Sequence, residues 1–180
     1  RRSSCPIRYD GDVNPYLALT EDFNAGALRA VISSGQAVVL HRLSIASKDG
    51  DWILRETPEA LAHVLDVLAR REATYRFGAP LDVRWMRGGW SAHLDHALAG
   101  LRLRTDFVTR PPRITTEALT ALWTTAAKSR PPVVDLLSLI ALKQTGRERD
   151  YAVIGELARH LPAPDQRLRH ARSAQDLLDL

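Results

Sequence analysis

The chain has few of the features that mark a secreted or membrane protein. Among its 180 residues there is one cysteine, Cys5, which excludes an internal disulfide framework and fits a reducing compartment. Its longest apolar runs, such as residues 37–40, are far shorter than the roughly 20 residues that cross a bilayer. No apolar run follows the first residues, as a signal peptide would require. We therefore expect a soluble, cytoplasmic protein that has no membrane partner.

Several catalytic sequence patterns are also absent. The sequence has no Gly-x-Ser-x-Gly elbow, no Walker loop and no Rossmann glycine pattern, so those three chemistries lose their usual support. Lysine is restricted to Lys48, Lys128 and Lys143, and arginine supplies nearly all the positive charge of a chain with a net charge of +4. The planar guanidinium group suits phosphate, so this composition permits a phosphorylated ligand. No compact basic run indicates a nucleic-acid-binding tail.

What is present is the composition and patterning of an ordinary globular protein. With 45% hydrophobic and 26% charged residues, the chain suits one domain, or one domain with a small helical appendage. Apolar spacing predicts a helix from Thr20 to about Ile32 and another that starts after Thr57. Short apolar or alternating runs predict strands at residues 37–40, 52–54, 74–77, 81–85 and 101–108. Further helices are predicted near residues 116–127, 133–145, 150–160 and 173–180.

This order of elements predicts an α+β fold. We expect a twisted mixed β-sheet flanked by helices, followed by a helical C-terminal part. The predicted divisions are an irregular lead-in over residues 1–19, an α/β domain over residues 20–130 and a helical segment over residues 131–180. The boundary between the last two falls near Pro131.

The pattern with the clearest chemical meaning is Asp49-Gly50-Asp51, which runs directly into the apolar segment 52–54. Carboxylates at positions i and i+2 project from the same side of an extended backbone. Held that close, they repel, and each raises the pKa of the other unless a cation lies between them. Mg²⁺ takes oxygen ligands of this kind, usually together with substrate phosphates. Upstream, a Ser34-Gly35 turn can bring backbone N–H groups and a hydroxyl to phosphate oxygens, so the two segments predict a site for nucleotidyl transfer.

A third carboxylate on a later strand would strengthen this interpretation. Asp106 lies on the polar face of the alternating segment 101–108, beside Arg102 and Arg104, and is our candidate. Asp82, which alternates with apolar neighbours in segment 81–85, is the rival candidate.

With these residues in place, the segment from Ser34 to Leu54 resembles the nucleotidyltransferase superfamily typified by DNA polymerase beta. The resemblance is to its small bacterial members of the abortive-infection and toxin–antitoxin type. Those members carry Gly-Gly-x-Ala, an apolar segment, His-Gly and then Arg-x-Thr-x-Asp-x-Asp. This chain places residues 34–37, 41–42 and 45–51 on those motifs, with Ser34, Arg42 and Ile45 where glycine, glycine and arginine are usual. Asp106 matches the third acidic residue, and residues 135–150 are similar to a helical Lys … Gly-Arg-x-x-Asp segment.

The resemblance implies transfer of a nucleoside monophosphate from a nucleoside triphosphate to a hydroxyl acceptor, with Mg²⁺ or Mn²⁺ as cofactor. The acceptor is left open between a protein, an RNA end and a small molecule, and members of the toxin–antitoxin type have a separate partner chain. The implied site residues are the catalytic and metal-binding carboxylates of Asp49, Asp51 and Asp106, and the nucleotide-binding groups of Ser34, Gly35 and Lys143.

Several of these assignments have a plain structural alternative. Lys143 can equally stabilise the C-terminal dipole of its helix, and Asp150 can be the N-cap of the next helix. Residues 87–93 can form a substrate loop in which Trp90 stacks on a base, or a hairpin turn that needs its glycines just as much. The residues at positions 34 and 45 leave a second function open, namely a catalytically inactive nucleotide-binding or regulatory module on the same fold.

Overall fold

The computed structural model describes residues 14–44 and 47–178. Cys5, Ile45, the first thirteen residues of the expected lead-in and the last two residues of the predicted C-terminal helix lie outside the described residues. The described strands are β1 (Ala30–Ser33), β2 (Asp49–Leu54), β3 (Thr74–Gly78), β4 (Ala92–Leu98) and β5 (Leu101–Val108). The described helices are α1 (Pro15–Phe23), α2 (Ser34–Leu40), α3 (Pro58–Ala69), α4 (Val83–Arg87), α5 (Thr116–Ala126), α6 (Leu136–Lys143), α7 (Glu148–Arg159), α8 (Pro164–His170) and α9 (Ala174–Leu178).

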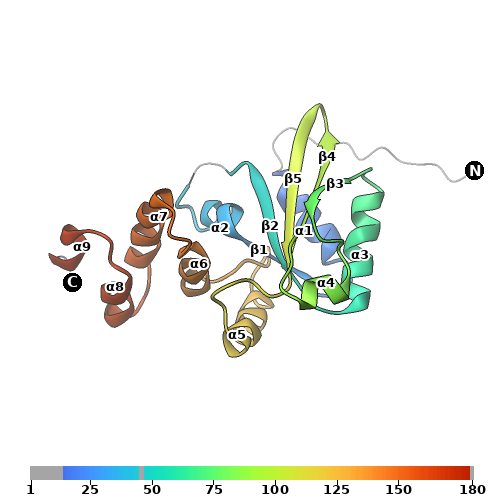
Figure 1. The fold of residues 1–180 in the computed structure, drawn as a ribbon. Helices are drawn as coiled ribbons and strands as arrows, with labels where there is room; N and C mark the ends of the chain where they lie inside the picture. Colours follow the sequence, from blue (N-terminus) through green and yellow to red (C-terminus); the bar gives the residue numbers. More distant parts are fainter. Residues whose placement is uncertain (1–13, 45–46, 179–180) are drawn as a thin grey trace, which may run out of the picture.

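The strands form one mixed sheet in the order β1-β2-β5-β4-β3 (Figure 1). β2 runs parallel to β5, and every other neighbouring pair is antiparallel. The register aligns one residue of each strand in a single row across the sheet: Ser33, Asp51, Asp106, His93 and Phe77. The predicted α+β fold with a mixed sheet flanked by helices is confirmed.

One face of the sheet carries an aromatic core. Trp52 and Phe107 of neighbouring strands stack with their ring centroids 5.5 Å apart, and Phe23 of α1 meets both rings edge-on. The indole nitrogen of Trp52 donates a hydrogen bond to Thr20 of α1. Successive residues of a strand point to opposite faces, so this core face lies opposite the side chain of Asp51. Figure 1 shows α1 and α3 together on one side of the sheet.

The helix predicted after Thr57 is confirmed as α3. The hydroxyl of Thr57 accepts a hydrogen bond from the backbone N–H of Ala60, and Pro58 occupies the first turn, where its missing N–H is not needed. The predicted apolar stripe is buried against the core at Leu61, Val64 and Leu68. The strands predicted at residues 52–54, 74–77 and 101–108 are confirmed as well.

Two predicted strands are helical instead. Residues 37–40 belong to α2, which packs against β2. Residues 83–85 belong to α4, which Asp82 caps by accepting a hydrogen bond from the backbone N–H of Arg84. A short apolar or alternating run does not distinguish a strand from a short buried helix, because contacts with distant segments decide between them. β4 and α8 were not predicted from the sequence.

The predicted helix from Thr20 to Ile32 is wrong at both ends. α1 begins at Pro15, inside the expected irregular lead-in, where the side chain of Asn14 caps it. It ends at Phe23, and Asn24 then closes the turn: its side chain bonds to backbone groups of residues 20, 29 and 30. Residues 30–33 are therefore free to enter the sheet as β1.

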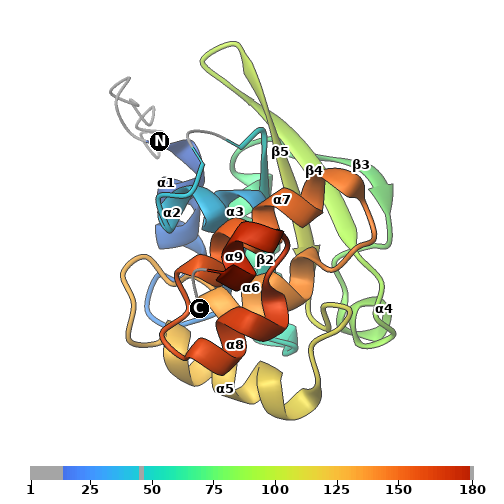
Figure 2. The same cartoon turned by 90° about the vertical axis from the view of Figure 1, so that its left-hand side faces the viewer.

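The helices predicted near residues 133–145 and 150–160 are confirmed as α6 and α7. Figures 1 and 2 show α6 to α9 on the side of the sheet opposite to α3. α6 packs against both α2 and α7. Within residues 14–44 and 47–178, no helix is long and apolar enough to cross a membrane.

Candidate active site

The polar face of the sheet gathers the carboxylates that the sequence singled out. Asp49 and Asp51 occupy alternate positions of β2, and Asp106 lies directly opposite Asp51 on the parallel strand β5. Neighbouring strands of a sheet are about 4.8 Å apart, so the backbones of Asp51 and Asp106 are adjacent. The rival candidate Asp82 is an exposed helix cap that pairs with Arg84, and it is not part of this group.

Gly50 separates the two carboxylates of β2, and the packing beneath it leaves little room for a side chain. It points to the opposite face, where a Cβ atom would overlap the rings of Trp52 and Tyr16. The hydroxyl of Tyr16 donates to the carbonyl oxygen of Lys48 at 2.7 Å, which anchors the start of β2 to α1. Burial and the nearby charge of Asp49 raise the pKa of Tyr16, so this hydroxyl remains a donor. The aromatic core thus fixes the position of the strand segment that carries the two carboxylates.

Asp51 is the electrostatic centre of the group. Burial raises the pKa of Asp51 to about 7, and the negative charges of Asp106 and Asp49 add to this effect. The positive charge of Lys143 and a hydrogen bond from the hydroxyl of Ser34 act in the opposite direction. Although the residue as a whole keeps some contact with solvent, its carboxyl group is largely removed from water. A carboxylate in this setting favours a neighbouring cation.

Asp49 carries a second sign of unsatisfied negative charge. Its Oδ1 atom is buried and has no hydrogen-bond partner in the part of the chain that the structure describes. The nearest guanidinium, of Arg104, lies 3.7 Å away, which is an ion-pair distance but too long for a hydrogen bond. A buried polar atom without a partner is unfavourable, and at a functional site it is a candidate ligand atom.

Asp106 already has partners on the next two strands of the sheet, β4 and β3. Arg76 of β3 donates to its Oδ1 atom, and Nδ1 of His93 on β4 lies 2.9 Å from the same oxygen. The imidazole ring is not aligned for a hydrogen bond despite this distance, and Nδ1 has no other partner among the described residues. Its Nε2 atom pairs with the hydroxyl of Ser91 at 2.7 Å. The charge of Asp106 acts on Asp51, but of these two carboxylates only that of Asp106 has a guanidinium partner among the described residues.

Lys143 reaches this group from the C-terminal end of α6. Its Nζ atom lies 3.8 Å from Oδ1 of Asp150, and it also acts on the charge of Asp51. Asp150 is buried in the first turn of α7, where Thr145 and Arg147 contact its other oxygen. The N-cap position predicted for Asp150 is occupied by Arg147, so that prediction is wrong. Asp150 instead fixes the turn between the two helices and holds Lys143 toward the sheet.

The Ser34-Gly35 turn lies at the start of α2, directly after β1. Ser34 has a backbone φ of 50°, and Ser33 partners Asp51 in the register of β1 and β2. Gly35 packs closely on Ser47, whose hydroxyl would have to rotate away from a Cβ atom at position 35. A hollow of about 230 Å³ adjoins the turn, with Gly35, Ser47 and Lys143 among the residues that line it. The two segments predicted to bind nucleotide, far apart in the sequence, therefore meet at one hollow.

The predicted site residues lie near one another on the polar face of the sheet and at the adjoining hollow, and sequence reasoning missed two of their partners. Arg76 had no predicted role, and His93 was predicted only as part of the substrate loop or hairpin turn over residues 87–93. The alternation of polar Ser91, His93 and Asp95 with apolar Ala92 and Leu94 was the signal that could have predicted β4.

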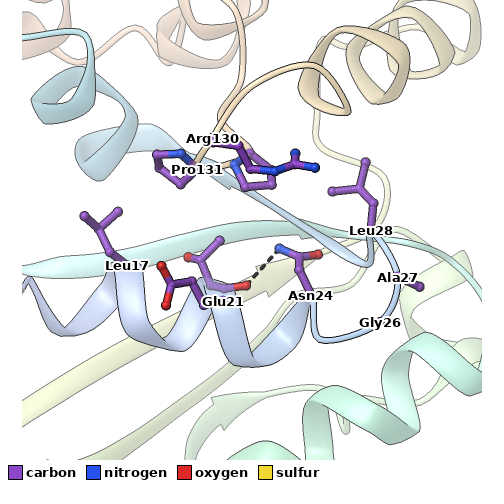
Figure 3. Close-up of a pocket in the computed structure, with 10 residues that line it drawn as sticks. Leu17, Glu21, Asn24, Gly26, Ala27, Leu28, Arg130 and Pro131 are labelled. Atoms are coloured by element: carbon purple, nitrogen blue, oxygen red, sulfur yellow. Dashed lines mark hydrogen bonds between the residues drawn. The ribbon is translucent and has the colours of Figure 1, made fainter.

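A larger groove of about 610 Å³ lies elsewhere and contains none of these residues (Figure 3). It is bounded by α1, by the turn at residues 24–28 and by residues 130–132. Asn24, which lines it, donates to the carbonyl oxygen of Thr20, as the dashed line in Figure 3 shows. This groove has no group of carboxylates comparable to that around Asp51, and we assign it no function.

Comparison with known proteins bears on the fold. No family model and no curated protein sequence matches the chain. Among solved structures it is similar to the crystal structure of a "putative nucleotidyltransferase" from H. pylori, with a TM-score of 0.51 over 86% of this chain and 73% of that one. The fold is nucleotidyltransferase-like. At 14% sequence identity, the similarity concerns the nucleotidyltransferase-like fold itself, and the chemistry has to be argued from the site.

The donor atoms at this site are carboxylate oxygens, which a hard divalent cation prefers. Among the described residues, no three His, Cys, Asp or Glu side chains are arranged ready to hold a metal ion, so the expected convergence of three carboxylates on one point is not found. The unpaired buried oxygen of Asp49 and the raised pKa of Asp51 nevertheless fit a cation that takes oxygen ligands. Asp49 and Asp51 therefore fit such an ion as they stand, whereas Asp106 shares its carboxylate with Arg76.

Proposed function

We propose that the protein is a nucleotidyltransferase that moves a nucleoside monophosphate from a nucleoside triphosphate to a hydroxyl acceptor, with Mg²⁺ or Mn²⁺ as cofactor. The observation that carries the proposal is the Asp51 carboxyl group. It is removed from water beside two further carboxylates, on a nucleotidyltransferase-like fold, with Lys143 approaching from the helical side. Such a group needs more positive charge than the described residues supply, and a divalent cation bound together with the triphosphate brings that charge.

Each residue has a definite part in this proposal. Asp49 and Asp51 would hold the divalent cation, which when bound neutralises charge on the reacting phosphates. Lys143 and the Ser34-Gly35 turn would bind the non-transferred phosphates, and Asp150 would keep Lys143 directed at them. Positioning and charge neutralisation supply most of the catalysis in phosphoryl-type transfers, so a site built from charged groups without a nucleophile is sufficient.

The transfer itself forms one bond and breaks one. The acceptor hydroxyl oxygen attacks the α-phosphorus, the bond from that phosphorus to the bridging oxygen of the β-phosphate breaks, and pyrophosphate leaves. Both contacts to Asp106 go to Oδ1, and Oδ2 has no hydrogen bond from the described residues. We assign Oδ2 of Asp106 to the acceptor hydroxyl, whose proton it can take.

A second candidate function is supported by a specific observation. Arg76 and Ser34 already contact the carboxylates of Asp106 and Asp51. A site whose acidic groups are partly neutralised by its own side chains also suits a module that binds nucleotide without transferring it. The resemblance to toxin–antitoxin members, with a separate partner chain, stays a prediction.

One pair of measurements separates these functions. Thermal unfolding is followed with each nucleoside triphosphate, with and without Mg²⁺, and transfer of an α-labelled nucleotide is followed with mixed acceptors. The transferase requires metal-dependent stabilisation and labelled product, both lost in Asp49→Asn and Asp51→Asn, with activity falling on the order of 100-fold or more. Asp82→Asn, an exposed carboxylate outside the group, is the matched control and should leave both unchanged. Stabilisation by nucleotide without metal and without product would favour the binding module, and no stabilisation at all would contradict both.

A further inference from the structure

A hollow of about 430 Å³ lies where β2 ends, between this strand and α5. Its walls are apolar at Ile114, Leu119 and Trp123, and threonine side chains also line it. None of the candidate active-site residues contributes to it. Arg55, which lines it, lies four residues beyond Asp51, a distance of about 13 Å along an extended strand. This Arg55 hollow is therefore separate from the site around Asp51.

The guanidinium group of Arg55 has an aromatic ring against it but no acid beside it. Its central carbon lies 4.0 Å from the centroid of the Trp123 ring, a contact that covers one face of the group. Among the described residues, the side chain of Arg55 takes part in no hydrogen bond and no ion pair. Burial lowers the pKa of Arg55, and no carboxylate of the described residues acts in the opposite direction. The group has thus lost part of its contact with water without gaining acceptors for its N–H groups.

Other partly buried arginines of the protein are paired. The side chains of Arg71 and Arg76 are 10% and 15% exposed, and each has a carboxylate partner, in Asp22 and Asp106 respectively. A purely structural contact between β2 and α5 would use only the face of the Arg55 guanidinium. It would leave the in-plane N–H groups, which form a planar fork, without acceptors. Because an unsatisfied charged group is unfavourable, stacking alone does not account for an arginine at this position.

The carboxylate of Glu56, which also lines the hollow, does not supply the missing acceptor. Each of its oxygens accepts a hydrogen bond of 2.7 Å from Arg110, and Thr109 donates to Oε2 as well. The hydrogen bonds from Arg110 hold the pKa of Glu56 below its ordinary value, so the two residues remain a charged pair that is neutral as a whole. The positive charge of Arg55 is therefore left uncompensated among the residues that line the hollow.

We propose that the Arg55 hollow is a second binding site, and that its ligand is an organic anion with a carboxylate or phosphate head group on an apolar body. The in-plane N–H groups of Arg55 bind two oxygens of the head group, while Trp123 holds the guanidinium in place. The apolar body lies against Ile114 and Leu119. Small-molecule sites are concave and mostly apolar, with a few fixed polar groups that orient the ligand, which matches this hollow. The site goes beyond the proposed transferase function and does not depend on it.

The test follows the tryptophan indole N–H signals of the full chain by nitrogen–proton correlation NMR. The signal of Trp123 is assigned by its loss in Trp123→Phe. The probes are benzoate and phenyl phosphate, and benzyl alcohol provides the same ring without a charge. We expect the Trp123 signal to shift along a saturating curve with at least one of the two anions, and benzyl alcohol to bind about tenfold more weakly or worse. Whichever anion binds more tightly identifies the head group.

Substitution of Arg55 tests whether its guanidinium holds the anion. Arg55→Gln removes the charge and should raise the Kd of the anion about tenfold or more. Arg55→Lys keeps the charge but loses the planar fork, so its loss of affinity should be intermediate. Arg149→Gln removes the charge of an exposed arginine on α7 and should leave the Kd unchanged. The same spectra show whether each variant is folded, and Arg55→Lys provides the comparison if Arg55→Gln is not.

Three results would overturn the proposal: no shift of the Trp123 signal with either anion, benzyl alcohol bound as tightly as the anions, or an unchanged Kd in both Arg55 variants. A fourth comes from thermal unfolding with nucleoside triphosphate and Mg²⁺. Arg55→Gln should keep the stabilisation that the proposed function requires, and its loss would mean that Arg55 belongs to the transferase site and not to a second one. If no triphosphate stabilises the protein but the anions bind through Arg55, the second site stands and the transferase is wrong.

Discussion

The two faces of the sheet differ in how completely their groups are satisfied. On the core face, Trp52 and Phe107 are fully buried, stacked on each other and closed off by α1. One residue away on the polar face, the carboxyl group of Asp51 is removed from water beside other carboxylates, and Oδ1 of Asp49 has no hydrogen-bond partner among the described residues. The comparison teaches that this sheet obtains its stability from one face, whereas the other face holds carboxyl groups whose ionisation is unfavourable. Such local departures from full satisfaction are expected at functional sites.

The largest effect is expected from breaking the core face. Trp52→Ala removes an indole that packs against Phe23 and Phe107 and donates to Thr20, so the free energy of unfolding should fall by about 3–5 kcal/mol. Urea unfolding followed by circular dichroism measures the change. Trp85→Ala, which removes a largely exposed indole, is the control and should cost less than about 1 kcal/mol. Equal losses in the two variants would mean that the core is not where the structure places it.

On the polar face, the buried carboxyl group of Asp51 should make the stability of the protein depend on pH. The folded-state pKa of Asp51, about 7, lies above its ordinary value, so the folded protein binds more protons than the unfolded chain between about pH 4 and pH 7. Without added metal, this group's contribution to stability is therefore present at low pH and is lost as the pH rises through 7.

Asp51→Asn should remove that loss, on the order of a few kcal/mol at pH 8, and have little effect at pH 4. Chemical unfolding of both proteins across this range provides the measurement. A variant that is less stable than the unsubstituted protein at pH 8 would contradict the raised pKa. Mg²⁺ added at pH 8 should stabilise only the unsubstituted protein. It should therefore reduce the difference in free energy of unfolding between that protein and Asp51→Asn.

Gly50 couples the two faces, and a smaller loss is expected there. In Gly50→Ala the added methyl group overlaps Trp52 and Tyr16, and overpacking of this kind costs about 1–3 kcal/mol. Because the rings must move, the hydrogen bond from Tyr16 to Lys48 that anchors the start of β2 should weaken, and nucleotide stabilisation should decrease as well. A Gly50→Ala protein with unchanged stability and unchanged nucleotide response would show that the core does not support the carboxylate pair.

The smallest effect is expected at a polar-face charge that is well solvated. Arg104 and Asp49 form a loose, half-exposed ion pair, so Arg104→Gln should change the free energy of unfolding by less than about 1 kcal/mol. The same denaturation experiment detects it. A loss comparable to that of Trp52→Ala would mean that this face is also a source of stability, which would abolish the contrast between the faces.

Much of the candidate site could be derived from local patterns. The i and i+2 spacing of Asp49 and Asp51 before an apolar run sufficed to place both on one side of a strand. The alternation over residues 101–108 likewise identified Asp106 as a polar-face residue. These inferences succeeded because the period of a strand is a property of the backbone and does not depend on what lies beside it.

The wrong secondary-structure predictions concern segments whose conformation depends on long-range contacts. The run at residues 37–40 becomes helical because it packs on β2, and the stretch after Phe23 enters the sheet because Asn24 closes the turn. Asp82 is a residue type that commonly caps helices, but its alternation with apolar neighbours led to the prediction of a strand at residues 81–85. Short segments carry too little local preference to resist such contacts.

The sequence by itself determined which residues could do chemistry and which face of a strand each would occupy. Only the tertiary structure decided that β5 pairs with β2 in a register that sets Asp106 beside Asp51, and that Arg76 and His93 reach Asp106 from the next two strands. It also decided that Lys143 approaches from α6, held by Asp150. The physical reason is that strand order and register are fixed by the packing of the whole sheet against its helices, and no local spacing encodes them.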